Sequence, residues 1–525
     1  MDSSTEQALA LTEAAGGLPD WARNSVQALL DQLQQQAAET ARLSAALKHA
    51  EAKNQALTLE LAHLRRLRFG AKSEALSAEQ RDLFQETLET DIAACEAEAE
   101  QAVPEAKPCA KRERAGRQPI PSHLPRIEHR FEPESCTCGH CGQDLVKIGE
   151  DISEQLDVEP ARFFVHRNIR PQYACRACET ITAAPIPAAI IDGGLAAPGL
   201  LAWVAIGKYA DHLPLYRIEQ MAARQQVVLS RSTLAEWMGR VGVALTPLAD
   251  RLAELLKQSP VLHADETPVA QLDPGAGKTK RATLWAYHSN RLAAGPPIVV
   301  FDYQASRSGR HASDFLSGWQ GHLMVDDYAG YKALFRSGAT ELACLAHARR
   351  KFFDLVVANQ SPIAQEALAR IGRLYAIEQA GRGLDAEARR ALRQREAKPV
   401  LDALFTWLYA TRQSLADGGA TAKAIDYSLK RWEALIRYAD SGDLPIDNNP
   451  VENAIRPIAI GKKNWLFAGS ERAGKRAAAI QTLIGTARLN GLDPATWLRD
   501  TLEKLPAWPN NRIDELLPLR NTANS

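Results

Sequence analysis

The chain has 525 residues, too many for one hydrophobic core, so three or more domains are expected. Its 46% hydrophobic and 24% charged residues are ordinary for a soluble globular protein. A formal net charge of zero argues against a nucleic-acid partner, but the charge is segregated. Residues 86–105 hold seven acidic and no basic side chains, 107–130 hold seven basic and two acidic ones, and 456–476 hold six and one. Local basic patches are therefore available.

No export or membrane signal is visible. The N-terminus is polar and acidic, and the longest apolar stretch, 195–206, contains Pro198 and Gly199 and is too short for a bilayer. We therefore expect a cytoplasmic protein with no membrane partner. Four of the eight cysteines form two Cys-x-x-Cys pairs, which in a reducing compartment indicates metal rather than disulfides.

The N-terminal region follows a heptad pattern. After a loose tail at 1–20, residues 21–68 keep one register from Val26 for about six repeats, and nine of the twelve a and d positions are apolar. Asn54 at an a position is suited to fixing register and strand number. The pattern predicts a coiled coil that makes the protein a homo-oligomer; the alternative is an amphipathic helix packed on its own chain. Residues 69–125 are expected to be a linker, basic at its end.

A zinc ribbon is expected at 126–188. Cys138, Cys141, Cys175 and Cys178 form two pairs separated by 33 residues, and four thiolates complete one tetrahedral structural zinc site. Between the pairs, 152–158 and 162–169 alternate as strands do.

Residues 189–258 are expected to be helical. Tyr216 to Arg224 is followed by a connection and a second helix that Ser230 or Ser232 could cap. A DNA-reading helix-turn-helix, with Arg231 as a contact, and an ordinary helical pair fit this pattern equally well.

The pattern changes to β at 259–360. Four β-like runs (261–264, 282–287, 297–301 and 322–325) precede a fifth at 341–345, which leads into a basic helix with Arg349, Arg350 and Lys351. A helical insertion is expected at 361–440, a last motif region at 441–487, and a short C-terminal tail at 488–525.

Three distant carboxylates fit a metal pocket. Asp265 and Asp326 each end a short apolar run, and Glu452 falls in the first turn of an expected helix. Two strand-end aspartates and a helical glutamate can converge on two divalent cations, which activate an oxygen nucleophile against a phosphodiester. Glu266 and Asp327 adjoin the aspartates, so spacing alone leaves either neighbour open as the ligand.

The segment around Glu452 supports such a pocket. A helix that starts near Pro450 puts Asn449, Glu452, Asn453 and Arg456 on one face. Lys462 and Lys463 then continue as a DNA-backbone-contacting strip, or as a solvated face. Gly469 to Arg476 nearly matches a phosphate-binding P-loop, but Arg476 stands where a hydroxyl would hold magnesium, so ATP binding is not expected.

Four motifs together resemble the transposases of the insertion sequence 66 family. They are His263-Ala-Asp-Glu-Thr-Pro268, Asp326-x-Tyr328-Ala-Gly-Tyr331, Cys344-x-x-His347-Ala-Arg-Arg-Lys-Phe352, and Asp447-Asn-Asn-Pro-Val-Glu-Asn-Ala-Ile-Arg-Pro457 through Ser470. The similarity extends to the N-terminal zipper, Arg68-Phe-Gly-x-Lys-Ser-Glu74 and the zinc ribbon, and so covers nearly the whole chain.

The resemblance implies an α/β multidomain protein whose catalytic core is ribonuclease-H-like, with a helical insertion before the glutamate. The family's DDE triad falls on Asp265, Asp326 and Glu452, which would hold two Mg²⁺ (or Mn²⁺) ions. At the second position the family usually has Asp-Gly-Tyr, and Asp327 replaces the glycine here. Cys344 and His347 match a Cys-x-x-His pair; with two ligands visible, a structural role is expected.

The implied activity is cleavage of double-stranded DNA at the element's terminal inverted repeats and strand transfer into target DNA by a two-metal mechanism. Zinc ribbon and helix-turn-helix would bind the ends, in the bacterial cytosol or nucleoid. Accessory proteins encoded by the same element are expected partners. The alternative is a catalytically decayed DNA-binding repressor or scaffold of the same family.

Overall fold

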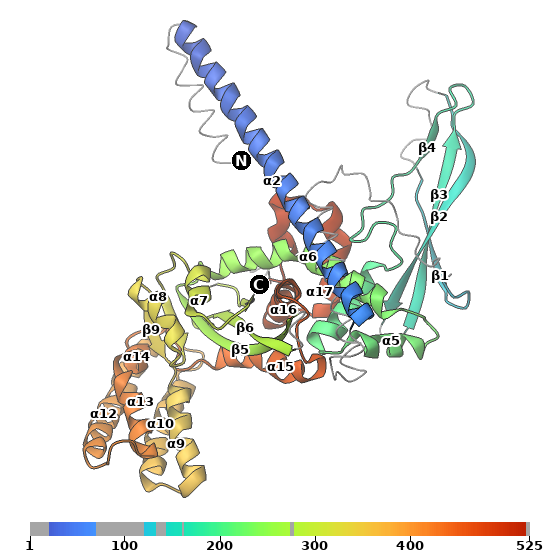
Figure 1. Cartoon of the computed structure of the whole chain (residues 1–525). Coiled ribbons are helices and arrows are strands. Elements are labelled where there is room, and N and C mark those ends of the chain that lie inside the picture. Colours follow the sequence, from blue (N-terminus) through green and yellow to red (C-terminus); the bar gives the residue numbers. More distant parts are fainter. Residues whose placement is uncertain are drawn as a thin grey trace. The chain divides into compact units, whose positions relative to one another are not determined.

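The computed structural model describes residues 20–69, 120–132, 143–159, 162–273, 278–293 and 295–520 (Figure 1). The chain forms two compact units, Met1–Ala71 with Ile92–Gln118, and Lys72–Asp91 with Pro119–Ser525. Among the described helices, none combines the length and the apolar character needed to cross a bilayer. Most of the expected linker and Cys136, Cys138, His140 and Cys141 lie outside the described residues.

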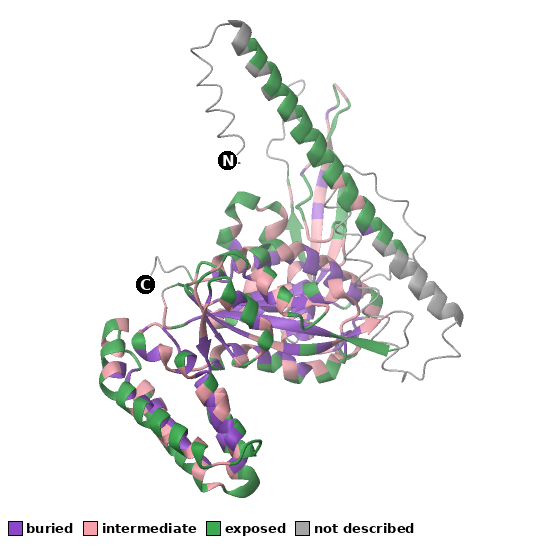
Figure 2. Cartoon of the chain, turned by 60° about the vertical axis from the view of Figure 1, so that its left-hand side comes forward, coloured by how far each residue is buried: buried purple, intermediate pink, exposed green. Residues whose placement is uncertain are grey.

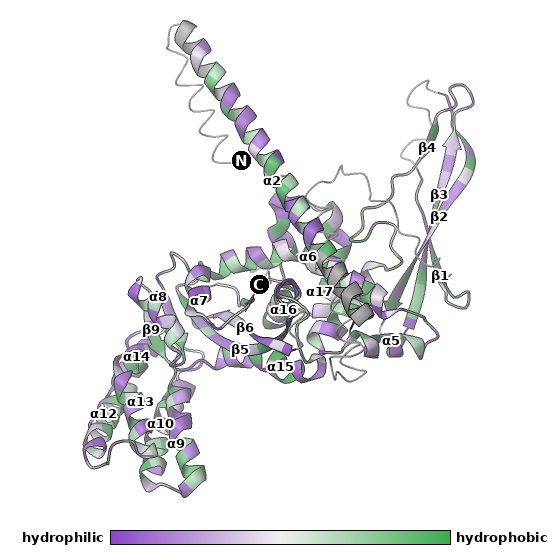
Figure 3. Cartoon of the chain, viewed as in Figure 1, coloured by the Kyte–Doolittle hydropathy of each residue, from purple (hydrophilic) through white to green (hydrophobic). Residues whose placement is uncertain are grey.

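The first unit is built on one long helix, α2 (Asp20–Phe69). No proline or glycine interrupts its 50 residues, so the helical part of the coiled-coil prediction is confirmed. Figure 2 shows most of the described part of α2 as exposed, and Figure 3 shows hydrophobic residues interspersed with hydrophilic ones along it. Five leucines at a and d positions leave 53–61% of their surface exposed: Leu29, Leu33, Leu43, Leu47 and Leu57. The helix therefore carries a long apolar stripe that its own unit does not cover.

The second unit begins with a four-stranded sheet. Strands β2 (Val146–Glu159) and β3 (Arg162–Ala174) form an antiparallel hairpin that contains both expected strands, and β1 (Arg126–Arg130) and β4 (Ile181–Ala183) pair with β3. The turn end of the hairpin packs on the following helices, because Leu156, Phe163 and Val165 share a core with Leu200.

Helices follow as expected: α4 (Pro198–Ala205), a π-helical turn (Ile206–Ala210), α5 (Leu215–Ala223) and α6 (Arg231–Leu256). Ser230 is the cap of α6, since its Oγ accepts the Thr233 N–H at 3.1 Å. A seven-residue connection, 224–230, separates α5 from α6. Much of α6 faces the core through Leu234, Trp237, Met238 and Val241, so only a small part of its first turns is open to a partner.

A five-stranded mixed sheet forms the centre of the unit. Its strands are β5 (Val261–Asp273), β6 (Lys278–Ser289), β7 (Val299–Gln304), β8 (His322–Val325) and β9 (Thr340–Ala343), in the order β7-β6-β5-β8-β9. β6 is antiparallel to both of its neighbours, β5 and β7, whereas β8 and β9 run parallel to β5. The five expected β runs are confirmed. The prediction that the first run ends at Asp265 is wrong, because the β5–β6 ladder continues to the Asp273–Lys278 pair.

Alternation along the strands divides the sheet into two faces. Leu262, Ala264, Trp285 and Tyr287 face the core formed with α6 and α7 (Gly309–Phe315). The opposite face packs on α15 (Asn449–Trp465), and the buried residues of that contact are Ala282, Leu284, Ala286, Val451, Ile455 and Ile458. Trp465 is partly buried against the same cluster. Helix α16 (Glu471–Leu489) lies along β7, where the hydroxyls of Thr482 and Thr486 accept the N–H groups of Phe301 and Val299.

Helices fill the stretch between β9 and α15. The basic helix expected after the fifth β run is α9 (Leu345–Asn359). The stretch 361–440, where a helical insertion was expected, contains α10 (Pro362–Ala380), α11 (Ala386–Leu392), a π-helical turn (Arg393–Ala397), α12 (Lys398–Gln413), α13 (Ala420–Lys430) and α14 (Trp432–Ile436). Arg393 is fully buried, pairs with Glu378 at 2.6 Å and donates to the carbonyls of Tyr438 and Leu444. This pairing fixes the path of the chain back toward α15.

The C-terminal segment is not the tail expected from the sequence. It forms α17 (Pro494–Lys504) and two 3₁₀ helices, Leu505–Ala507 and Asn510–Leu516. Leu498 and Leu502 are buried in the core that includes α4, and Asp514 pairs with Arg251 at 2.7 Å. Leu498 and Leu502, four positions apart, were the feature of the sequence that could have predicted a helix here.

We predict that Gly474→Ala destabilises the fold by about 1–3 kcal/mol. A Cβ at Gly474 would lie 2.3 Å from Cε1 of Tyr303, a buried side chain of β7. The matched control is Gly372→Ala in the exposed part of α10, where a Cβ meets nothing within 4 Å. The control should be neutral or stabilising by up to about 1 kcal/mol. Thermal denaturation of both variants checks this, and equal melting temperatures would contradict it.

Candidate active site

The register of β5 and β8 sets two aspartates side by side. His263 pairs with Met324 in parallel register, and continuing that register by two residues aligns Asp265 with Asp326. Neighbouring strands lie about 4.8 Å apart. β8 ends at Val325, as expected, so Asp326 is the first residue beyond it, while Asp265 remains inside β5. The two residues are therefore neighbours where the parallel partner of β5 stops, and the charge of Asp326 contributes to raising the pKa of Asp265.

Glu452 lies in the first turn of α15, on the face of the sheet to which Asp265 points. The helix begins at Asn449 with Pro450 in its first turn, as the sequence predicts. Buried Asn448 fixes this end of the helix: its Nδ2 donates to the Ala264 carbonyl at 2.9 Å, and its Oδ1 accepts from Nδ1 of His263 at 3.1 Å. Its own N–H donates to Cys344 Sγ at 3.2 Å. Asn448 thus joins β5, α9 and α15 beside Asp265.

Burial, together with neighbouring carboxylates, raises the pKa of Asp265. Burial is the largest cause, the N–H of Glu266 opposes it, and the charges of Glu266, Asp326 and Glu452 add to it, which brings the pKa to about 7. Carboxylates that repel one another in a partly buried pocket are stabilised by a cation. The donor set therefore suits a divalent metal ion.

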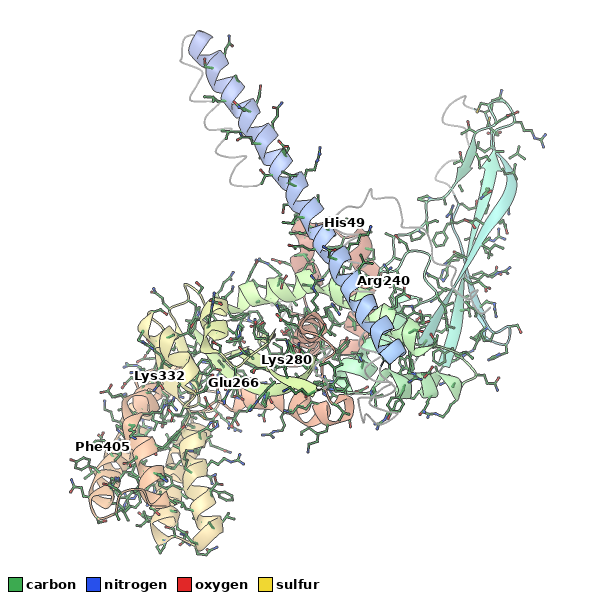
Figure 4. All side chains as sticks on the ribbon, in the orientation of Figure 1. His49, Arg240, Glu266, Lys280, Lys332 and Phe405 are labelled. Carbon is green, nitrogen blue, oxygen red and sulfur yellow. The ribbon has the colours of Figure 1, made fainter. Side chains whose placement is uncertain are left out.

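Glu266 points away from this pocket. Successive residues of a strand face opposite sides, so Glu266 lies on the α6 and α7 side, with only 2% of its side chain exposed. It accepts from Arg307 Nε at 3.0 Å and from the Tyr331 hydroxyl at 2.8 Å (labelled Glu266 in Figure 4). Its carboxylate is already satisfied by protein donors, which leaves Asp265 as the available member of the pair.

Asp326 and Asp327 also differ in their surroundings. Asp327 is exposed and lies 3.8 Å from Nε of Arg431, whose guanidinium also pairs with Glu341 at 2.6 Å. Asp326 instead closes a tight turn by accepting the Tyr328 N–H at 2.9 Å. Arg307 and Arg431 were not identified from the sequence, whereas Tyr331 and Asn448 stood inside the family motifs without an assigned role.

The candidate DNA-contacting residues divide into exposed and engaged side chains. Arg349, Arg350, Arg456 and Lys463 are exposed, and no carboxylate pairs with them in the described part of the chain. Asn453 is also exposed. The others have protein partners: Arg231 with Glu219, Lys351 with the Tyr427 ring, Asn449 with Asp447, and Lys462 with the Pro268 carbonyl.

The second cysteine pair of the ribbon forms a turn between β3 and β4. The Glu179 N–H donates to the Cys175 carbonyl at 2.8 Å, and Cys175 is buried while Cys178 is half-buried. A short Cys-x-x-Cys turn of this kind is compatible with zinc ligation. Cys138 and Cys141 lie outside the described residues.

The P-loop-like segment is the start of a helix rather than a phosphate loop. Ser470 caps α16, with its Oγ accepting the Ala473 N–H at 3.0 Å. Gly474 lies inside the helix at the contact with Tyr303, so its role is close packing of α16 on β7.

Comparisons with known proteins identify the modules. The family described as "Transposase IS66 family" matches residues 193–476, more than half of the chain. Three more families match: "zinc-finger binding domain of transposase IS66" at 135–179, "Transposase C of IS166 homeodomain" at 56–128 and "IS66 C-terminal element" at 482–519. The zinc-finger match supports a structural zinc in this part of the chain.

Two relatives are similar to this chain over most of its length. The uncharacterized protein y4qI of Sinorhizobium fredii (strain NBRC 101917 / NGR234) is 39% identical over 499 residues, 92% of each chain. The uncharacterized protein y4jD of the same strain is 40% identical over 483 residues, 88% of this chain and 94% of its own. The resemblance found in the sequence is thereby confirmed, and this chain belongs to the IS66 family of transposases.

Proposed function

We propose that the chain is a DDE transposase that cleaves DNA at the ends of an insertion sequence and joins them to target DNA. The observation that carries the proposal is the β5–β8 register, which aligns Asp265 with Asp326 next to the helix start bearing Glu452. The strand order β7-β6-β5-β8-β9, with β6 antiparallel to both neighbours, supports a ribonuclease-H-like core. The proposed domain boundaries are those expected from the sequence. The exception is 488–525, which is a helical segment rather than a tail.

Asp265, Asp326 and Glu452 are the proposed ligands of two Mg²⁺ (or Mn²⁺) ions. The raised pKa of Asp265 and the mutual repulsion of the three carboxylates support this donor set. Bound divalent ions would polarise phosphodiester oxygens and lower the pKa of an attacking hydroxyl. Asn448 holds the glutamate's helix against β5, and Arg307 keeps Glu266 out of the pocket.

DNA would lie along the exposed side of α9 and α15. Arg349, Arg350, Arg456 and Lys463 offer charge for backbone phosphates. A hollow of about 690 Å³ adjoins this surface between α10, α15 and α16. Its lining includes Arg291, Arg382 and Arg488 as well as the carboxylates of Glu378 and Asp447, so its charge is mixed.

The other modules would organise the ends. We propose that Cys138, Cys141, Cys175 and Cys178 hold the zinc, that the ribbon and the α5–α6 region contact the terminal inverted repeats, and that the exposed leucines of α2 pair protomers. Double-stranded DNA in the bacterial cytoplasm would be the substrate, with accessory proteins of the element as further partners.

Asp326→Asn is expected to reduce Mg²⁺-dependent cleavage of labelled element ends by about 1000-fold or more, because it removes a metal-binding charge. Asp265→Asn should do the same while retaining end binding in a gel-shift assay. The matched control is Asp327→Asn, next in the chain but exposed beside Arg431, and it should cleave normally. Retained cleavage by Asp265→Asn and Asp326→Asn would overturn the assignment. An inactive wild type that still binds the ends would favour the decayed repressor.

The pKa of Asp265 predicts a pH-dependent stability. Its folded pKa of about 7 exceeds the ordinary value of 3.8, so the folded protein binds the extra proton and this group destabilises the fold as pH rises from about 4 to about 7. In the absence of metal, the free energy of unfolding of Asp265→Asn should therefore exceed that of the wild type by roughly 1–3 kcal/mol between about pH 5 and pH 8. Mg²⁺ should raise the melting temperature of the wild type at the higher pH and that of the variant much less. A pH-independent difference would contradict the prediction.

The apolar stripe of α2 predicts self-association. Leu33→Asp with Leu47→Asp introduces charges at two a positions and should shift the protein toward monomer in sedimentation analysis. Gln35→Asp with Ala38→Asp places the same charges at exposed positions outside the a and d seam and should leave the oligomer unchanged. A wild type that sediments as a monomer would refute pairing through α2.

A further inference from the structure

A second group of metal-binding side chains adjoins the three carboxylates. Cys344 precedes α9 and His347 lies in its first turn, and the structure adds a third ligand that the sequence did not associate with them, Glu452 of α15. One ligand atom from each of these residues lies within 4.8 Å of the other two. His347 Nδ1 and Glu452 Oε1 are 3.5 Å apart. In a tetrahedral zinc site, bond lengths of 2.0–2.3 Å put ligand atoms about 3.5 Å from one another.

The hydrogen bonding of these atoms points to a missing partner. His347 Nδ1 and Glu452 Oε1 are both inaccessible to solvent, and neither has a hydrogen-bond partner within the described residues. Buried polar atoms are normally satisfied. The thiol of Cys344 is buried in the same place and accepts the Asn448 N–H, a contact that a metal-bound thiolate also makes. The side chains of His347 and Glu452 are 35% and 28% exposed, which leaves a route for an ion from solvent.

We propose that Cys344 Sγ, His347 Nδ1 and Glu452 Oε1 form a Zn²⁺ site separate from the zinc ribbon. Thiolate and imidazole favour Zn²⁺, whereas Mg²⁺ takes oxygen ligands, so this site and the carboxylate pocket select different ions. On binding, the Cys344 S–H proton passes to solvent as the zinc–sulfur bond forms. Three protein ligands leave the fourth position open to water.

Sharing Glu452 gives the site a regulatory consequence, which rests on the proposed function. A zinc ion bound to Oε1 takes one oxygen of the proposed catalytic glutamate and adds positive charge beside Asp265. Zinc bound here therefore competes with Mg²⁺ for the pocket and inhibits cleavage at fixed Mg²⁺ concentration. The metal-binding proposal itself does not depend on any catalytic activity.

The test is the zinc content of the purified full-length protein after dialysis against metal-free buffer. Cys344→Ser and His347→Gln should each contain one zinc per chain less than wild type, whatever the ribbon holds. Glu452→Gln should lower the zinc content by the same amount. Because this variant leaves the buried Cys344 unchanged, its zinc loss cannot be attributed to misfolding around the cysteine. Equal zinc content in wild type and Glu452→Gln would overturn the proposal.

Asp265→Asn is the matched control, since Asp265 adjoins the site without belonging to it. This variant should keep the full zinc content while losing Mg²⁺-dependent cleavage. Loss of zinc from Asp265→Asn would assign the ion to the carboxylate pocket and refute the site. Retained cleavage with retained zinc would refute the proposed function alone, so the two failures are distinguishable.

Discussion

The parallel pairing of β5 with β8 is the constraint on which the rest of the site depends. It brings Asp265 and Asp326 to the same level on adjacent strands, at the point where β8 ends. Burial is the main cause of the raised pKa of Asp265, and repulsion from neighbouring carboxylates, Asp326 among them, adds to it. The surrounding structure makes sense as a means of holding this unfavourable arrangement in place.

Three features of the structure hold Asp265 in this position. The hairpin of β5 and β6 continues past Asp265 to Asp273, which keeps the aspartate inside a regular strand. Asn448 binds the Ala264 carbonyl and His263, and so anchors α15 at the same place. Burial lowers the pKa of His263 to about 3, so its ring stays neutral and donates from Nδ1. Two hydrogen bonds of the buried Asn448 side chain and one of its backbone N–H give the helix start a unique position.

Arginines bind the carboxylates that adjoin the two aspartates in sequence. Arg307 pairs with Glu266 on the opposite face of the sheet, and Arg431 lies beside Asp327. Each neighbour in an acidic pair is thereby directed away from the pocket, which explains how adjacent acidic residues coexist with a selective site. The substitution of Asp327 for the usual glycine is tolerated for the same reason, since its side chain is exposed.

Much of the architecture followed from local patterns. Heptad spacing predicted the uninterrupted α2, alternation predicted β2, β3 and the strands of the central sheet, and Asn-Asn-Pro predicted the start of α15. The C-terminal helix α17 was missed because its short apolar face is packed by tertiary contacts rather than marked by long periodicity. The end of β5 was misplaced because a strand's length is set by its partner β6.

By itself the sequence determined the order of the modules, the family, and a set of acidic residues suited to a metal. Spacing left both members of each acidic pair open, and the family resemblance favoured Asp265 and Asp326. Only the tertiary structure gave the physical reason, because the direction of each side chain depends on strand register and on arginines distant in sequence. The same holds for the meeting of Glu452 with Cys344 and His347, which lie about a hundred residues away along the chain and become neighbours only when α15 packs against the start of α9.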